Sequence, residues 1–105
     1  MVYSPVFTRT AQNTYFEMLN YLKETYSDKA VVSFVQNVFT ILEYISNHPT
    51  MFPESPTHWK YRRALVDRYT SIYYSISEIR KQVVIHLFWH NKRNPKYLKV
   101  FLGLE

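Results

Sequence analysis

The chain contains no cysteine and a single glycine, Gly103, among its 105 residues. Without thiols it forms no disulfide and offers no thiolate to a metal, so a reducing cytoplasm is the expected compartment. One glycine is too few for the glycine-rich loops that hold phosphates in many enzymes. No apolar run approaches the ~18 residues of a membrane-spanning helix, and the N-terminus lacks the pattern of a signal peptide. We therefore expect residues 1–105 to form one cytoplasmic domain with no membrane partner.

Aromatic residues and positive charge, in contrast, are abundant. The chain is 18% aromatic, with ten tyrosines, and its net charge is +5. Before His58 there are three basic and five acidic residues, a net charge of −2, and from His58 onward there are ten and three, a net charge of +7. A half-chain this basic indicates a polyanionic partner, either nucleic acid or an acidic protein segment, with an ordinary solubilising surface as the alternative. The tyrosines fit either a half-exposed binding surface or an aromatic core.

Hydrophobic spacing in the first half predicts a short edge strand followed by two helices. The strand spans residues 3–7, and apolar residues then recur every three or four positions through residues 9–26 and again through residues 28–47. Thr8 and Ser27 are placed to cap the two helices. So few residues separate the helices that they must fold back as an antiparallel hairpin.

Three apolar residues of the second helix, Val32, Phe39 and Ile41, lie off its main stripe. They are either flanking core or a second apolar face that a partner covers. Together with the positive second half, such a face suits an acidic, amphipathic peptide.

The hydrophobic period changes to two after a connecting segment at residues 48–60 that holds three prolines. Strands are predicted at residues 61–66 and 70–77, and the apolar run at residues 82–89 is typical of a central strand that is buried on both faces. The sequence therefore predicts an α+β domain, in which an N-terminal antiparallel helical hairpin packs on a small antiparallel β-sheet.

The four histidines do not have the spacing of a metal site. His86 and His90 show the i,i+4 spacing of a helical zinc site, but on a strand four residues span about 13 Å, too far for one ion. His48 and His58 lie in the connecting segment, where the sequence does not place them. No nucleophile motif surrounds a serine and no paired carboxylates stand out, so we expect neither a metal nor another cofactor.

The remaining candidate site is a set of basic residues with tyrosines between them. The basic residues are Lys60, Arg62, Arg63, Arg68, Lys92, Arg93, Lys96 and Lys99, and the tyrosines are Tyr61, Tyr69, Tyr73 and Tyr97. Cations bind phosphates, and aromatic rings stack on unpaired bases. Metal-free RNA cleavage needs a base, an acid and cations that stabilise the charge on the phosphate. For this chemistry we assign His90 as acid or base, Arg93 as the charge stabiliser and Tyr97 as a proton donor.

Arg62 and Arg63 are neighbours on one predicted strand, so their side chains must project from opposite faces. At least one of them therefore serves a purpose outside any shared site. Basic charge alone gives binding and not chemistry.

The order of these segments resembles the RelE/ParE family of toxins from bacterial toxin–antitoxin pairs. The resemblance rests on the hairpin that ends in Asn47-His48-Pro49, on residues 61–66 and 69–74, and on residues 88–95 with their terminal Arg-Asn-Pro. It covers nearly the whole chain. It implies the α+β fold described above and a dedicated antitoxin whose C-terminal segment wraps the toxin and neutralises it.

Two activities occur in that family, and the resemblance leaves both open. RelE-like members cut mRNA on the ribosome. For this activity Arg93, or Lys92 with a shift of one, matches the late basic residue, and Tyr97 approximately matches the C-terminal tyrosine. Arg62 and Arg63 lie where basic residues of the first long strand belong. ParE-like members inhibit DNA gyrase and have no hydrolytic site. Ser71 stands where the nucleases often carry an arginine, and the Arg-Asn-Pro ending resembles the ParE side, so gyrase inhibition is slightly favoured. The third alternative is an inactive member that only binds its antitoxin and helps repress their operon.

For either activity the resemblance implies a macromolecular target, DNA gyrase or the ribosome with its mRNA, and no small-molecule substrate. A basic surface is the expected contact with that target. The residues assigned to this surface are Arg62, Arg63, Arg68, Lys92 and Lys96.

Overall fold

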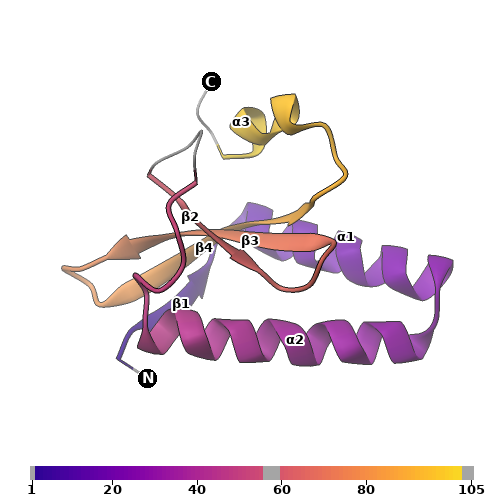
Figure 1. The fold of residues 1–105 in the computed structure, drawn as a ribbon, viewed down its shortest axis with the longest axis horizontal. Helices are drawn as coiled ribbons and strands as arrows, with labels where there is room; N and C mark the ends of the chain where they lie inside the picture. Colours follow the sequence, from indigo (N-terminus) through magenta and orange to yellow (C-terminus); the bar gives the residue numbers. More distant parts are fainter. Residues whose placement is uncertain (1, 56–59, 103–105) are drawn as a thin grey trace.

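The computed structural model describes residues 2–55 and 60–102 of the chain. A four-stranded sheet forms the middle layer, with two long helices on one face and a short C-terminal helix on the other (Figure 1). Every predicted helix and strand is confirmed to within one residue at each end. In chain order the elements are β1 (Ser4–Phe7), α1 (Arg9–Thr25), α2 (Asp28–Asn47), β2 (Arg62–Leu65), β3 (Thr70–Ser77), β4 (Gln82–His90), η1 (Pro95–Tyr97) and α3 (Leu98–Phe101).

The strand order in the sheet is β1-β4-β3-β2. Strands β2, β3 and β4 pair antiparallel, as predicted, but β1 runs parallel to β4, with Ser4 opposite Gln82 and Phe7 opposite Ile85. The α+β class is therefore confirmed, and the sheet is mixed where a wholly antiparallel one was expected. A tight turn between two neighbouring strands forces them to run antiparallel. β1 is followed by the helical hairpin and not by such a turn, so it can pair parallel with β4.

Side-chain caps start both long helices where the sequence predicts them. The Thr8 hydroxyl accepts a hydrogen bond from the Ala11 amide (3.0 Å), and the Ser27 hydroxyl accepts one from the Ala30 amide (3.2 Å). Asp28 in the first turn of α2 adds a favourable interaction with the helix dipole. None of the described helices combines the length and the apolar character that crossing a bilayer requires.

Hydrophobic cores lie on both faces of the sheet, which confirms that β4 is buried on both sides. The larger core lies under the two long helices: Ala11, Met18, Phe34, Val38, Ile45, Ala64, Val66, Ile72, Tyr74, Val83, Ile85 and Phe88. The smaller core lies under α3: Tyr61, Tyr73, Leu87, Trp89, Leu98 and Leu102. Between them β4 contains a bulge, because Tyr73 pairs with Leu87 and Tyr74 with Ile85, so His86 is the extra residue.

Candidate functional site

The candidate site lies where β3 begins and β4 ends. Thr70 pairs with His90 across these strands, and the Asn91 amide donates to the Tyr69 carbonyl (2.7 Å). An Asp67 carboxylate oxygen accepts from the amides of Tyr69 (2.8 Å) and Thr70 (2.9 Å), which fixes the loop before β3. These bonds hold two chain segments side by side. We call residues 67–70 and 90–93 the basic end of the sheet.

Two cations flank the exposed tyrosine of the basic end. The Arg68 guanidinium lies 5.9 Å and the Lys92 ammonium 5.8 Å from the centre of the Tyr69 ring. Both distances are in the range of cation–π attraction. The Tyr69 side chain is 47% exposed, so its ring and both charges face solvent together.

His90 sits between two tyrosines. Its ring stacks on Tyr69, with centroids 6.4 Å apart and planes 26° apart, and meets Tyr21 edge-on at 5.9 Å. The His90 Nδ1 atom accepts a hydrogen bond from the Lys92 amide (3.2 Å), so the neutral ring carries its proton on Nε2. His90 is therefore oriented as a hydrogen-bond donor at its other nitrogen.

The predicted catalytic residues are only partly brought together. His90 and Arg93 line one depression of about 410 Å³, which also includes Glu17, and Tyr97 is not among its lining residues. The Arg93 guanidinium lies 4.3 Å from the centre of the Phe101 ring, where it helps hold α3 against the sheet. Tyr97 is 48% exposed and its ring pairs with the Lys96 ammonium at 5.2 Å.

Arg62 and Arg63 project from opposite faces of β2, as predicted. Arg62 donates to the Phe52 carbonyl (2.7 Å) and so joins the strand to the segment after α2. Arg63 donates to the Ser71 hydroxyl (3.0 Å) and to the Asn91 side-chain oxygen (3.2 Å). Only Arg63 is thus connected to the basic end of the sheet.

Two of the four tyrosines expected between the cations are core residues. Tyr61 and Tyr73 are 9% and 5% exposed, and the Tyr61 hydroxyl donates to the Leu102 carbonyl (3.1 Å). Their rings belong to the smaller core and are not open for stacking. Tyr69 remains open to solvent. Tyr21 near the end of α1 and Tyr26 at its C-cap are exposed as well, and nothing in their spacing predicts a place in the site.

His86 belongs to a separate polar contact on the α3 side of the sheet. A hydrogen bond joins its Nε2 atom to the Ser75 hydroxyl (2.7 Å), and its ring lies 4.9 Å from that of Tyr61. Burial lowers the pKa of His86 below its usual value of 6.5. Among the described residues no three His, Asp or Glu side chains gather as metal ligands, and His58 lies outside the described residues.

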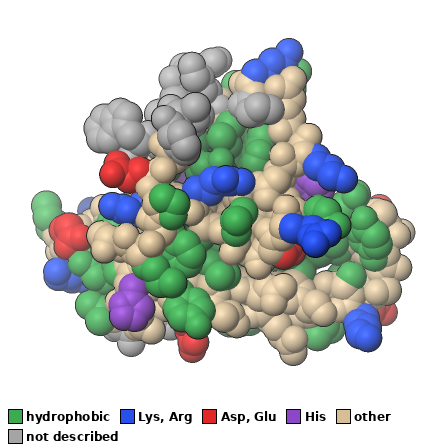
Figure 2. All heavy atoms as spheres, in the orientation of Figure 1, with side chains coloured by type: hydrophobic (Ala, Val, Ile, Leu, Met, Phe, Trp, Pro, Cys, Tyr) green, Lys and Arg blue, Asp and Glu red, His purple; other side chains and the backbone are tan. Residues whose placement is uncertain are grey.

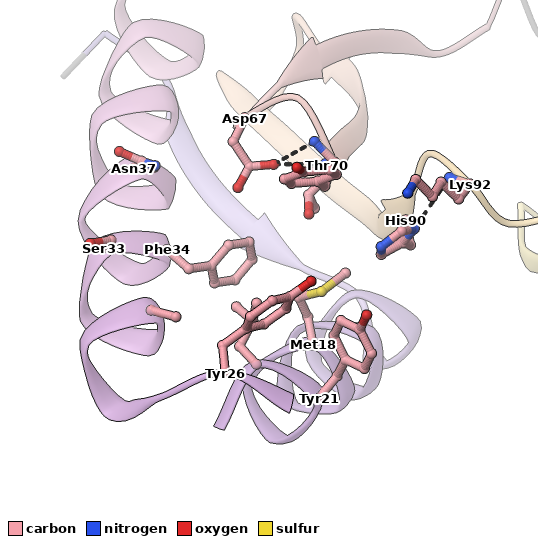
Figure 3. A pocket seen from close by; sticks show the side chains of 13 residues that line it. Met18, Tyr21, Tyr26, Ser33, Phe34, Asn37, Asp67, Thr70, His90 and Lys92 are labelled. Carbon is pink, nitrogen blue, oxygen red and sulfur yellow. Dashed lines mark hydrogen bonds between the residues drawn. The ribbon is translucent and has the colours of Figure 1, made fainter. Parts of the chain in front are cut away.

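A cavity of about 310 Å³ opens between the basic end of the sheet and the helical hairpin (Figure 3). Met18, Leu22 and Phe34 give it an apolar floor. Its rim is aromatic and polar: Tyr21, Tyr26, Asn37, Asp67, Tyr69, His90 and Lys92. A second groove of about 480 Å³ lies between β1 and the helices and is lined mainly by apolar side chains, with Phe39 among them.

Comparison of structures, and not of sequences, relates this chain to known proteins. No protein-family model matches the sequence, and no curated protein matches it closely. The chromosomal ParDE toxin–antitoxin system from Pseudomonas aeruginosa aligns with a TM-score of 0.70 at 13% identity, over 85% of this chain and 96% of that chain. The YoeB/ParE toxin from Agrobacterium tumefaciens aligns with a TM-score of 0.60 at 10% identity, over 83% and 96% of the two chains.

A third solved structure is the toxin–antitoxin complex RelBE2 from Mycobacterium tuberculosis. It aligns with a TM-score of 0.56 at 17% identity, over 86% of this chain and 99% of that chain. In all three cases the match spans almost the whole of the other chain. The resemblance in the sequence is thereby confirmed at the level of structure: this chain has the RelE/ParE toxin fold.

Proposed function

We propose that this chain is the toxin of a type II toxin–antitoxin pair and that it inhibits growth in the ParE manner, by acting on DNA gyrase. The observation that carries the proposal is the fold, shared over nearly the whole domain with a ParDE system. The helical hairpin and the α+β class also agree with what the sequence predicts. The molecule also presents two surfaces that such a toxin needs, one for an antitoxin and one for a target.

The antitoxin surface is the outer side of the helical hairpin. Val32 and Phe39 are 55% and 68% exposed, as expected for a partner-covered face, and Phe16 adds a further ring at 58%. Ile41 differs from the expectation because it packs against the larger core. Phe39 also lines the apolar groove beside β1. An amphipathic antitoxin segment buries its apolar side in a groove of this kind.

The target surface is the basic end of the sheet, which includes Arg93, together with Lys96. Figure 2 shows Lys and Arg side chains distributed over the visible face with hydrophobic side chains between them. Such a mixture suits a macromolecular partner, because the cations steer association and the apolar groups are buried on contact.

Gyrase inhibition is preferred to RNA cleavage because the three cleavage residues do not all converge. Arg93 stacks on Phe101 and Trp89, and Tyr97 does not line the depression that His90 and Arg93 share. One observation favours ribosome-dependent cleavage as the second candidate: His90, Arg93 and Glu17 surround the same open depression, which supplies an acid–base pair and a cation.

Pulse-labelling of DNA, RNA and protein synthesis in bacteria after induction of this chain tests the proposal. The expected result is an early fall in DNA synthesis, prevented when the cognate antitoxin is produced with the chain. Relaxation of plasmid supercoils in the same cells should accompany that fall. An early fall in protein synthesis instead selects the mRNA endonuclease. Unchanged growth and synthesis overturn the proposal of an active toxin.

A further inference from the structure

The cavity beside the basic end of the sheet is bordered by a continuous series of aromatic rings. Tyr26 meets Tyr21 at a centroid distance of 6.3 Å, Tyr21 meets His90 at 5.9 Å, and His90 meets Tyr69 at 6.4 Å. Tyr21 lies near the end of α1 and Tyr26 is its C-terminal cap, whereas Tyr69 lies in the loop before β3 and His90 is the last residue of β4. Figure 3 shows Tyr21, Tyr26 and His90 at the border of the cavity. Two layers of the fold therefore face each other across the cavity with aromatic side chains.

These rings are open to solvent and are not part of a core. Tyr21, Tyr26 and Tyr69 are 43%, 66% and 47% exposed. The pKa of Tyr26 is raised chiefly by the neighbouring Tyr21 hydroxyl, and Tyr69 and Lys92 act on the same group in opposite directions, so the polar tips converge. Exposed tyrosines that gather in this way are typical of binding surfaces.

Positive charge and hydrogen-bond donors lie on one side of the cavity. Lys92 lines it, and Arg68 stacks on the same Tyr69 ring from outside. The Nε2 proton of His90 is left for a ligand, because Nδ1 already accepts from the Lys92 amide. Figure 3 shows the His90 ring at the edge of the space between hairpin and sheet.

The other side offers groups that suit the edge of a base. Asn37 and Ser33 on α2 and Asp67 in the loop before β3 line the cavity opposite the histidine. One Asp67 oxygen is held by the Tyr69 and Thr70 amides, which fixes the carboxylate and orients its second oxygen. An amide, a hydroxyl and a carboxylate can together donate to and accept from the polar edge of a heterocycle.

The volume and the charge of the cavity determine which kind of ligand fits it. About 310 Å³ is at the small end of the range of ~300–1,000 Å³ for ligand pockets, so it admits one ligand unit and not a helix. At the Tyr69 ring a cationic ligand is disfavoured, because Arg68 and Lys92 already flank this ring and repel further positive charge. Asp67 is the one carboxylate among the described residues of the lining, and the Tyr69 and Thr70 amides already donate to it. The complementary ligand has a flat aromatic part and an anionic part.

We propose that this cavity binds one nucleotide, with the base against the tyrosine rings and the phosphate at Lys92 and the His90 Nε2 proton. Base stacking on tyrosines and phosphate contact with a cation are the two elements by which proteins hold single nucleotides of unpaired strands. The site needs no glycine-rich loop, because Lys92 and the His90 Nε2 proton take the place of backbone amides at the phosphate. The proposal does not rest on the toxin assignment.

The test is calorimetric titration of the purified full chain with AMP, GMP, CMP and UMP, with the matching nucleosides, with inorganic phosphate, and with single-stranded tetranucleotides. We expect at least one mononucleotide to bind with a Kd of about 1 mM or tighter, and its nucleoside to bind more weakly. Tyr69→Ala and Tyr26→Ala should each weaken binding roughly five- to hundredfold, the range for loss of one base-stacking ring. Lys92→Gln should weaken nucleotide binding and leave nucleoside binding unchanged.

Matched controls exist within the chain. Tyr44 is exposed to the same extent as Tyr69, 47%, and does not line the cavity, so Tyr44→Ala should leave binding unchanged. Lys81 stacks on Tyr3 at 5.3 Å near the β3–β4 turn, so Lys81→Gln removes an equivalent cation–π pair elsewhere. Circular dichroism verifies that each variant is folded, and Tyr26, at the end of α1, is exposed enough for its replacement to leave the core intact.

Each outcome of these titrations either supports or overturns the proposal. Equal binding of mononucleotide and tetranucleotide supports a free nucleotide as ligand, and tighter binding of the tetranucleotide supports the end of a single strand. Binding that survives Tyr69→Ala and Tyr26→Ala, or that the two control variants weaken equally, overturns the proposal, as does the absence of binding by every probe. Phosphate that binds as tightly as the nucleotides also overturns it, since the base then contributes nothing.

Discussion

At the scale of single residues, His86 shows how one local irregularity sets a chemical property. Its position in the bulge of β4 turns the ring toward Ser75 and Tyr61 on the α3 side of the sheet, where burial lowers its pKa. The unfolded chain therefore takes up a proton near pH 6.5 that the folded chain does not. Folding stability should be unaffected by His86 above that pH and should fall as the pH decreases below it.

Urea unfolding of the chain between pH 7.5 and 5 at constant ionic strength measures this effect. We expect the free energy of unfolding to decrease with pH below 6.5, and the decrease to become smaller in His86→Gln, whose amide does not titrate. Gln36→Ala on the exposed side of α2, which removes no titratable group, is the control and should keep the original slope. A slope that is the same in His86→Gln and in the unsubstituted chain contradicts the assignment.

At the scale of elements, Thr14 joins α1 to the sheet. Its hydroxyl accepts a hydrogen bond from the Phe88 amide (3.0 Å) and donates to the Thr10 carbonyl (2.7 Å). This covers the edge of β4 beyond the point where β1 ends. Thr14→Val keeps the shape but leaves the buried Phe88 amide without its acceptor, which should lower the free energy of unfolding by about 1–3 kcal/mol.

Thr40 provides a matched control for that change. It makes the same bond to the carbonyl four residues earlier, Gln36, at 3.1 Å, but it lies on the exposed side of α2. Thr40→Val should alter the free energy of unfolding by less than about 0.5 kcal/mol. Chemical denaturation compares the two variants, and amide exchange of Phe88 should accelerate only in Thr14→Val. If Thr14→Val and Thr40→Val lower the free energy of unfolding equally, the proposed role of Thr14 in joining α1 to the sheet is contradicted.

The elements were predictable from the sequence because their signals are local. Helix caps at Thr8 and Ser27 and the change of hydrophobic period at the connecting segment set the boundaries almost to the residue. The β3–β4 turn is also where the predicted strand ends place it, although it contains no glycine. Lys81 takes the left-handed conformation that a glycine usually supplies in such a turn, with φ of 52°.

What the sequence did not reveal depends on contacts between distant segments. The parallel pairing of β1, the bulge at His86 and the packing of α3 on Trp89 are all decided by tertiary structure. The same holds for the site: Tyr26 continues the apolar stripe of α1 in sequence, yet it caps the helix, is 66% exposed and reaches the cavity rim. Only the fold brings it near Tyr69.

At the scale of the whole molecule, the two proposed surfaces are chemically different and separable. The hairpin presents exposed apolar side chains, and the basic end of the sheet presents cations. A substitution on the first should therefore abolish neutralisation by the antitoxin without abolishing growth inhibition. Phe39→Asp is the sharpest such change, because it places a charge in the lining of the apolar groove at a position that is 68% exposed and so tolerates polarity in the free chain.

We expect Phe39→Asp to weaken antitoxin binding by at least about tenfold, as loss of a central aromatic contact does in other interfaces. Ile79→Asp makes the same kind of change at the β3–β4 turn, where the side chain is 98% exposed, and should bind the antitoxin normally. Calorimetry of the purified pairs and growth of cells that produce both proteins give the two readouts. Growth arrest by Phe39→Asp in the presence of the antitoxin, with rescue of Ile79→Asp, places the antitoxin on the hairpin. Rescue of both variants moves it to another face, and loss of toxicity in Phe39→Asp alone makes the hairpin part of the target surface.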